Sequence, residues 1–415
     1  MSRLLRRAAW LATLAIGTAG PVGHAQQDAN ATAAGEAVTP FNIQVPDAVL
    51  TDLKDRLSRA RFPGEIPGAG WDYGTDLAYL KDLVTYWRTR YDWRAEERRL
   101  NQFHQYTTVI DGLTVHFVHQ RSSNPKALAL AVTHGWPGSI AEFTKIIAPL
   151  TDPAAHGGAA ADAFHVVAMS IPGFAFSGKP TERGYGPEKI AGVLTKLMAR
   201  LGYTRYGVQG GDWGSPISRF AALNDQAHVV GFHTNLCLAG PPAGAANPLE
   251  GVPQAEVARQ RAVAGFMENE RGYFQEQSTK PQTVGYGLDD SPVGLAAWVI
   301  EKFKTWSDSD GHVEKRFTKD ELLTNVMLYW VTQSGASSAR IYYENARAGG
   351  PVRKVEVPTA CAVFPKELAF APRRWVEAAH NLTRWTEMPR GGHFAALEEP
   401  GLLVDDIRAF FRTLR

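Results

Sequence analysis

The sequence Gly210-Gly211-Asp212-Trp213-Gly214-Ser215 joins an apolar run at 206–209 to a segment at 216–223 that has the apolar spacing of a helix. A strand that passes through small residues into a helix has the form of a nucleophile elbow, a turn that leaves room only for Gly or similar residues around its apex. The apex residue would be Asp212. The same six residues also fit an aspartate that caps the helix, and both interpretations stay open at this point.

An aspartate at the apex changes the chemistry that the turn would support. A carboxylate is already ionised at neutral pH, so it can attack a saturated carbon without a base to deprotonate it first. Esterases carry serine at this position, and Ser215 is not at the apex. A serine esterase is therefore disfavoured.

The chain has 415 residues, of which 44% are hydrophobic and 21% charged, enough for one large α/β domain with an insertion or for several smaller domains. Arg3, Arg6 and Arg7 precede an apolar run at 8–19, and a small-residue site ends at Ala25. This pattern predicts a signal peptide over 1–25 and an exported protein, periplasmic or secreted. The run is shorter than the roughly 20 residues of a membrane span, so no stable span is expected, with an uncleaved anchor as the alternative. Residues 26–39 are predicted to be a disordered lead-in.

Charge and cysteine usage limit the partners. Without the arginines of the signal peptide the charges nearly balance, so no nucleic acid is expected. Neither a CxxC pair nor a Cys/His cluster with zinc spacing occurs, and we expect no metal and no cofactor. Cys237 and Cys361 lie in apolar runs predicted to be core strands, and are expected to be free thiols, with a disulfide as the alternative. His116 and His119 would point to opposite faces of a strand, a poor ligand pair.

The order of predicted elements divides the chain into an N-terminal helical segment at 40–100, a first core part at 101–240, a helical cap at 241–350 and a second core part at 351–415. Strands and helices alternate in the first core part, which indicates a mostly parallel sheet with flanking helices. The cap would be inserted after the sixth strand. The strands are expected within 101–118 (two strands), 127–133, 164–170, 206–209, 229–238, 355–358 and 384–388. Helices are expected at about 47–60 and 75–91 in the N-terminal segment and at 140–150 in the first core part.

Three candidate groups follow predicted strands in the order Asp212, Glu367, His393. Nucleophile, then acid, then histidine is the order of the α/β-hydrolase fold, which is the predicted fold class. Glu367 lies in a loop, whereas three rival acids lie in a predicted strand or in helices: Glu356, Glu377 and Asp405.

The run His134-Gly135-Trp136-Pro137 follows the strand from which this fold supplies an oxyanion-hole amide. The amides of Trp136 and Trp213 could then hold the negative oxygen of a tetrahedral intermediate. A simple turn is the alternative.

Several linked motifs together resemble the microsomal-type epoxide hydrolases over about residues 39–415. They are Pro40–Ile43, Tyr86-Trp87, Tyr91–Arg94, His134–Ser139, Gly210–Ser215, Asp290–Ala297, Leu323–Trp330 and Arg390–Ala395. The resemblance implies that Asp212 is the nucleophile, His393 the base and Glu367 its orienting acid. It also implies that two cap tyrosines, Tyr273 and Tyr342, activate the epoxide oxygen. The N-terminus departs from the family, whose microsomal members carry a membrane anchor.

The activity expected from these residues is the conversion of an apolar epoxide to a vicinal diol through an ester on Asp212. Trp298, Tyr329 and Trp330 are candidates for an apolar substrate pocket, with core packing as the alternative. A haloalkane dehalogenase, in which Trp213 would help to bind the halide, and a non-catalytic secreted binding protein of the same fold are the competing functions.

Overall fold

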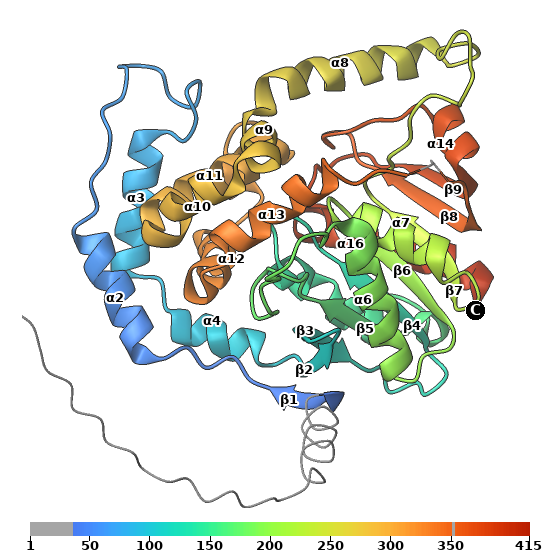
Figure 1. Cartoon of the computed structure of the whole chain (residues 1–415), viewed down its shortest axis with the longest axis horizontal. Helices are drawn as coiled ribbons and strands as arrows, with labels where there is room; N and C mark the ends of the chain where they lie inside the picture. The colour runs from blue at the N-terminus through green and yellow to red at the C-terminus, as the bar shows by residue number, and fades with distance from the viewer. Residues whose placement is uncertain (1–35, 351–352) are drawn as a thin grey trace, which may run out of the picture. The chain divides into compact units, whose positions relative to one another are not determined.

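A single mixed sheet of nine strands is the centre of the part of the chain that the structure, a computed structural model, describes: residues 36–350 and 353–415 (Figure 1). The order is β1-β2-β3-β5-β4-β6-β7-β8-β9. The pairs β1/β2, β2/β3 and β3/β5 are antiparallel and the remaining pairs are parallel. The strands are β1 Thr39–Phe41, β2 Gln105–Ile110, β3 Leu113–Gln120, β4 Leu128–Thr133, β5 Phe164–Met169, β6 Tyr206–Gly210, β7 Val229–Thr234, β8 Val355–Val363 and β9 His380–Glu387.

The parallel strands at the centre are buried along their whole length. Every residue of β4, LALAVT, and of β5, FHVVAM, is buried, as expected for strands covered on both faces. Helix α6 packs on α7 and α16 on α5, and these helices cover the sheet. The helices and 3₁₀ turns of the core are η1 Ile140–Lys145, α5 Ile147–Thr151, η2 Pro153–His156, η3 Ala160–Asp162, α6 Pro187–Arg200, α7 Gly214–Asn224, α14 Arg373–Ala379, α15 Ala395–Glu398, α16 Pro400–Phe411 and η5 Arg412–Leu414. The α/β-hydrolase prediction is confirmed.

A helical cap follows β7, the sixth strand counted from β2, as predicted. Ser291 and Thr318 cap their helices, and Thr318 forms a full capping box with Glu321. The cap consists of α8 Gln254–Glu270, α9 Gly272–Thr279, α10 Pro281–Asp290, α11 Pro292–Trp306, η4 Val313–Lys315, α12 Lys319–Thr332 and α13 Gly335–Asn345.

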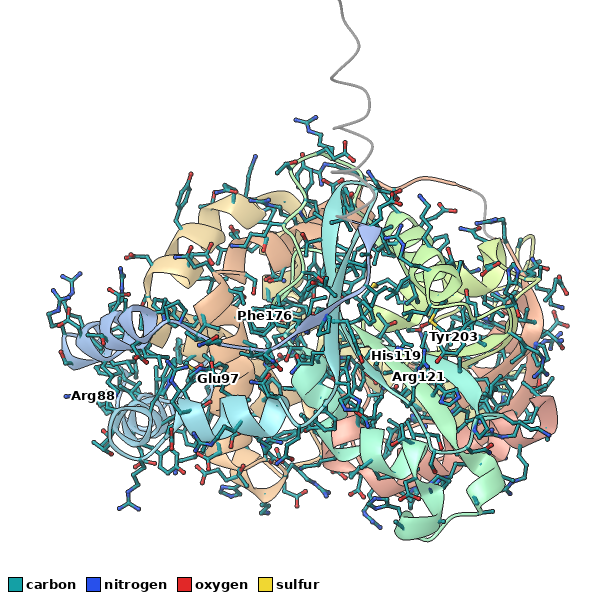
Figure 2. All side chains as sticks on the ribbon, turned by 90° about the horizontal axis from the view of Figure 1, so that it is seen from below. Arg88, Glu97, His119, Arg121, Phe176 and Tyr203 are labelled. Carbon is teal, nitrogen blue, oxygen red and sulfur yellow. A yellow bond between two sulfur atoms is a disulfide. The ribbon has the colours of Figure 1, made fainter. Side chains whose placement is uncertain are left out.

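The N-terminal segment packs its helices against the cap helices α11 and α12. It consists of α2 Asp47–Ser58, α3 Leu77–Thr89 and α4 Trp93–Leu100, of which α4 was not predicted. Glu97 of α4 is buried (Figure 2) and accepts hydrogen bonds from the Val45 amide at 2.7 Å, the Trp93 indole at 3.2 Å and Arg94 at 2.6 Å. The buried Glu97 carboxylate thus attaches the segment just before α2 to helix α4.

The structure describes only part of the predicted N-terminal regions. The predicted signal peptide lies outside the described residues, as do residues 26–35 of the lead-in. Residues 38–415 form one compact unit, and Thr39, the last residue of the predicted lead-in, pairs with Thr107 in the sheet. No helix in the described ranges is long and apolar enough to cross a bilayer. The predicted limits of the segments stay predictions.

Both histidines of β3 are buried in the core and have hydrogen-bond partners there. His116 is hydrogen-bonded to Ser170 and Gln105 at 2.9 and 3.0 Å, and His119 to the Tyr203 hydroxyl at 2.8 Å (Figure 2). Burial lowers the pKa of His116 to about 3 and that of His119 to about 4, so both imidazoles are neutral. Within the described ranges, no group of three or more His, Cys, Asp or Glu side chains is placed to hold a metal ion.

Three predictions about the core are wrong. The helix expected at 140–150 is a 3₁₀ turn, η1, followed by the short α5. Strand β7 ends at Thr234, so Cys237 lies in the loop beyond it and not in a strand. From that loop it reaches Cys361 of β8, and the two form a disulfide with a Cα–Cα distance of 5.9 Å, where free thiols were expected.

Removing the disulfide should destabilise the fold without disturbing the catalytic loops directly. The bridge joins residues 124 apart in sequence, so it restricts the unfolded chain. We expect Cys237→Ala/Cys361→Ala to lower the free energy of unfolding by about 2–4 kcal/mol, measured by urea denaturation. Reduced wild-type protein should match the double variant, and an unchanged urea midpoint would contradict the prediction.

Candidate active site

The turn between β6 and α7 has the geometry of an elbow. Asp212 has a positive φ of 45°, a left-handed backbone that non-glycine residues rarely adopt. A Cβ on Gly210 would lie 2.1 Å from the Gly214 carbonyl oxygen, and one on Gly214 would lie 1.8 Å from that of Thr133 in β4. Glycine is therefore required on both sides of the apex. The side chain of Asp212 points to Trp136 and His393 and does not cap α7, whose N-cap residue is Trp213.

Asp212, His393 and Glu367 form a connected chain of side chains. His393 Nδ1 is 2.6 Å from Glu367 Oε1, and His393 Nε2 is 3.3 Å from Asp212 Oδ2. Burial alone would lower the pKa of His393, but the negative charges of Glu367 and Asp212 raise it well above its usual value. The imidazole therefore carries its positive charge between two carboxylates. The rival acids are all exposed: Glu356, Glu377 and Asp405.

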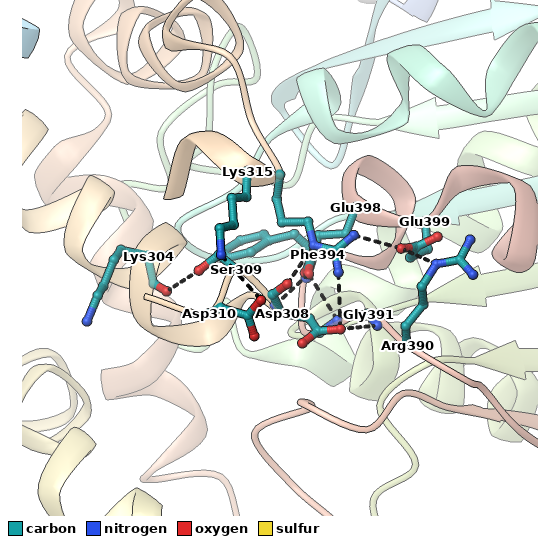
Figure 3. Close-up of polar contacts among 12 residues, drawn as sticks. Lys304, Asp308, Ser309, Asp310, Lys315, Arg390, Gly391, Phe394, Glu398 and Glu399 are labelled. Atoms are coloured by element: carbon teal, nitrogen blue, oxygen red, sulfur yellow. Dashed lines mark hydrogen bonds and ion pairs between the residues drawn. The ribbon is translucent and has the colours of Figure 1, made fainter. Parts of the chain in front are cut away.

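The loop carrying His393 is fixed by carboxylates that the sequence analysis did not identify (Figure 3). Glu398 accepts from the amides of Gly392 and Phe394 at 3.0 and 2.9 Å, and from the Asp308 amide at 2.8 Å. The Asp308 carboxylate accepts from the Gly391 amide at 2.9 Å. Because Asp308 follows cap helix α11, the cap and the histidine loop are joined directly. No sequence pattern marked these acids.

One of the two predicted oxyanion-hole amides contacts the aspartate. The Trp136 amide donates to Asp212 Oδ1 at 2.7 Å. A Cβ on Gly135 would lie 2.0 Å from the same oxygen, so glycine is needed there for the carboxylate to fit. The structure shows no hydrogen bond from the Trp213 amide to Asp212, both of which are described residues. The role of the Trp213 amide stays a prediction.

The two cap tyrosines meet above the loop that carries Trp136. The Tyr273 ring, from α9, stacks on the Trp136 ring at 5.2 Å, and the Tyr342 ring, from α13, meets it edge-on at 5.8 Å. Tyr342 also packs edge-on against Trp213 at 4.7 Å. Burial raises the pKa of both tyrosines, and the charge of Asp212 raises it further, so both phenols keep their protons. The adjacent Tyr343 is half-buried and its ring packs under Arg347.

The three aromatic residues predicted for a substrate pocket are placed as packing residues. The buried Tyr329 donates its hydroxyl hydrogen bond to the Gly138 carbonyl oxygen at 2.6 Å. The guanidinium of Arg56 lies 5.8 Å from the centre of the Trp330 ring. The Trp298 indole is 3.4 Å from Gln277 Oε1 on α9. Their positions favour the alternative of core packing over a pocket wall.

Comparison with known proteins agrees with this geometry. Residues 38–143 match the family described as epoxide hydrolase N terminus, and residues 129–363 match the alpha/beta hydrolase fold. A relative from Stigmatella aurantiaca (strain DW4/3-1), whose own assignment as an epoxide hydrolase is provisional, is 48% identical over 91% of this chain and 86% of its own length. Epoxide hydrolase 1 of Sus scrofa is 39% identical over 92% of this chain and 90% of its own.

A solved structure extends the likeness to three dimensions. The crystal structure of juvenile hormone epoxide hydrolase from Bombyx mori superposes with a TM-score of 0.84 and 33% identity, covering 92% of this chain and 95% of that one. The sequence relatives and the solved structure each cover 91–92% of this chain, and the N-terminal family match covers residues 38–143. The chain belongs to the epoxide hydrolase family with the α/β-hydrolase fold.

Proposed function

We propose that this protein hydrolyses an apolar epoxide to a vicinal diol through an alkyl-enzyme ester on Asp212. The observation that carries the proposal is the position of Asp212 at the apex of the elbow, between the Trp136 amide and His393. A carboxylate so placed is a nucleophile that needs no activating base. No cofactor takes part in the proposed reaction.

In the first step Asp212 attacks a ring carbon and the carbon–oxygen bond of the epoxide breaks. The leaving oxygen would become an alkoxide, and the phenols of Tyr273 and Tyr342 are the donors on the cap side. Because their pKa values are raised, both carry a proton at neutral pH and can donate it as the charge develops. The product is a hydroxyalkyl ester of Asp212.

In the second step water attacks the ester carbonyl carbon, with His393 as base. An imidazolium cannot accept a proton, yet two carboxylates hold the pKa of His393 high in the free enzyme. Esterification removes the charge of Asp212, so the pKa of His393 falls and the ring can pass its proton to the tyrosinate left by the first step. Glu367 stays bonded to Nδ1 and keeps Nε2 directed at the reacting water. The amide of Trp136 then stabilises the tetrahedral oxyanion.

The alternative activities have less support. A halide-binding site would use indole donors, and the buried indole N–H of Trp213 has no partner among the described residues. The same ring, however, lies against Tyr342, whose phenol is suited to an oxygen leaving group. A non-catalytic protein of this fold would not need three charged groups aligned within hydrogen-bonding reach.

We also propose that the protein is exported, periplasmic or secreted. The signal-like pattern at 1–25 motivates this, and a disulfide is typical of proteins that fold in oxidising compartments. The mature protein recovered from an exporting host should begin at Gln26, which N-terminal sequencing measures. Recovery of the full-length chain from the membrane fraction would instead support the uncleaved anchor.

Asp212 should be essential and should exchange oxygen with water. We expect Asp212→Asn to reduce diol formation by at least about 10⁴-fold, because the amide is a poor nucleophile. In heavy-oxygen water, the first diol released by the wild type should carry an unlabelled oxygen from Asp212. The peptide containing Asp212 should gain the label instead, which mass spectrometry detects. Label appearing directly in the first diol would refute the ester.

The cap tyrosines should act on the first step. We expect Tyr273→Phe and Tyr342→Phe each to slow ester formation by about 10²-fold, since one of two proton donors is lost. Stopped-flow measurement under single-turnover conditions reports this rate. Tyr343→Phe is the matched control, since its ring packs under Arg347, and it should behave as wild type. Equal losses in all three variants would contradict the assignment.

A further inference from the structure

A small cavity lies beside Asp212, and we call its polar lining the water chamber: Thr133, His134, Glu142, Gln209, Asp212, Asn235 and His393. Its volume is about 20 Å³, and a cavity of roughly 10–15 Å³ measured in this way already holds one water molecule. The chamber therefore has the size of a single water and includes both the nucleophile and the base.

The chamber also contains polar atoms that the protein leaves without partners. Gln209 Oε1 and Thr133 Oγ1 are buried and have no hydrogen-bond partner in the described part of the chain. The amide group of Gln209 is held in place, because its Nε2 donates to Asn235 Oδ1 at 3.0 Å. Buried polar groups nearly always have a partner, so these two atoms indicate a polar ligand such as water.

Glu142 carries the carboxyl group of the chamber that the proposed reaction does not use. Its carboxyl group is enclosed, although the residue as a whole is half-buried. A Cβ on Gly138 would lie 1.5 Å from Glu142 Oε1, so the carboxyl group occupies the space that only glycine leaves open. The backbone beneath it is fixed by the cap helix α12, where Asn325 donates to the Pro137 carbonyl oxygen at 2.7 Å and Tyr329 to that of Gly138 at 2.6 Å.

The electrostatics of Glu142 are coupled to the reacting groups. Burial raises its pKa to about 8, the charge of His393 lowers it, and the charge of Asp212 raises it again. The titratable groups that face it are Asp212 and His393 at the sheet edge and Tyr329 from α12. Esterification of Asp212 removes the charge that opposes ionisation, so Glu142 becomes a stronger hydrogen-bond acceptor in the second step.

We propose that Glu142 is a positioning residue that holds the hydrolytic water in this chamber for His393. The inference rests on the proposed function and extends it to the second step. The water would donate one hydrogen bond to Glu142 and its reacting proton to His393 Nε2, while its oxygen attacks the Asp212 carbonyl carbon. The ester bond to the substrate oxygen then breaks, and this leaving oxygen takes up the second proton of the water as the diol forms. The tyrosinate left by the first step has by then recovered its proton from the His393 imidazolium. The net products are the diol and the Asp212 carboxylate.

The competing interpretation is a structural helix cap. Ser139 is the N-cap of η1, its hydroxyl accepts from the Ala141 amide at 3.2 Å, and Glu142 stands three residues later, as in a capping box. Glutamine serves a capping box as well as glutamate does. Glu142→Gln therefore keeps the cap and the volume but removes the charge, and separates the two interpretations.

The test resolves the two steps with styrene oxide under single-turnover conditions, following ester formation and decay by rapid quench and intact-protein mass spectrometry. We expect Glu142→Gln to form the ester at the wild-type rate and to hydrolyse it about 10- to 100-fold more slowly, so the ester accumulates. Glu142→Asp, which keeps the charge, should hydrolyse faster than Glu142→Gln. His393→Gln serves as the reference for a blocked second step.

The matched control is Glu377→Gln, which alters an exposed glutamate of α14 that pairs with Arg373. It should leave both rates unchanged. Hydrolysis at the wild-type rate in Glu142→Gln, or an equal fall in both steps together with a lower melting temperature, would overturn the positioning role. A wild-type protein that forms no ester with any of a panel of epoxides would overturn the proposed function itself.

Discussion

The contact between two backbones, Gly214 at the start of α7 and Thr133 at the end of β4, is the constraint on which the active site depends. It lets the turn after β6 lie against the neighbouring strand, with Asp212 in a left-handed conformation at the apex. The loop that leaves β4 then passes beside the carboxylate, where the Trp136 amide reaches Oδ1. A side chain at position 214 would separate Asp212 from the Trp136 amide.

The second constraint is charge. Asp212, Glu367 and Glu142 are the carboxyl groups coupled to the buried His393, whose pKa the charges of Asp212 and Glu367 raise. Such a cluster cannot keep every group ionised at once, so the loss of one charge is felt by all the others. In the proposed reaction, esterification of Asp212 is that loss, and it lets His393 change from an acid into a base.

The sequence was informative wherever a functional group follows a strand. The sequence predicted that Asp212, Glu367 and His393 each follow a strand, and the structure brings the three together because parallel strands have their carboxyl ends at one edge of the sheet. The disulfide was missed because Cys237 was assigned to a strand that ends at Thr234. The sequence did not mark Glu142 as a functional residue, since a glutamate three residues after a serine is the ordinary pattern of a capping box. Its enclosure depends on Gly138 and on a cap helix nearly two hundred residues later, which no local pattern reports.

The cap has two separable tasks in this arrangement. Helices α9 and α13 carry Tyr273 and Tyr342, the proposed proton donors. Helix α12 and the loop after α11 instead hold loops of the core through hydrogen bonds. Tyr329 belongs to the second group: its hydroxyl is committed to the Gly138 carbonyl oxygen, so it fixes the backbone under Glu142 and is not available to a substrate. The cap is joined both to the loop that carries Trp136 and to the loop that carries His393. These contacts hold the cap tyrosines in a fixed position relative to Asp212. Catalysis by positioned charges gains most from such preorganisation, because a misplaced donor loses far more in rate than the fold loses in stability.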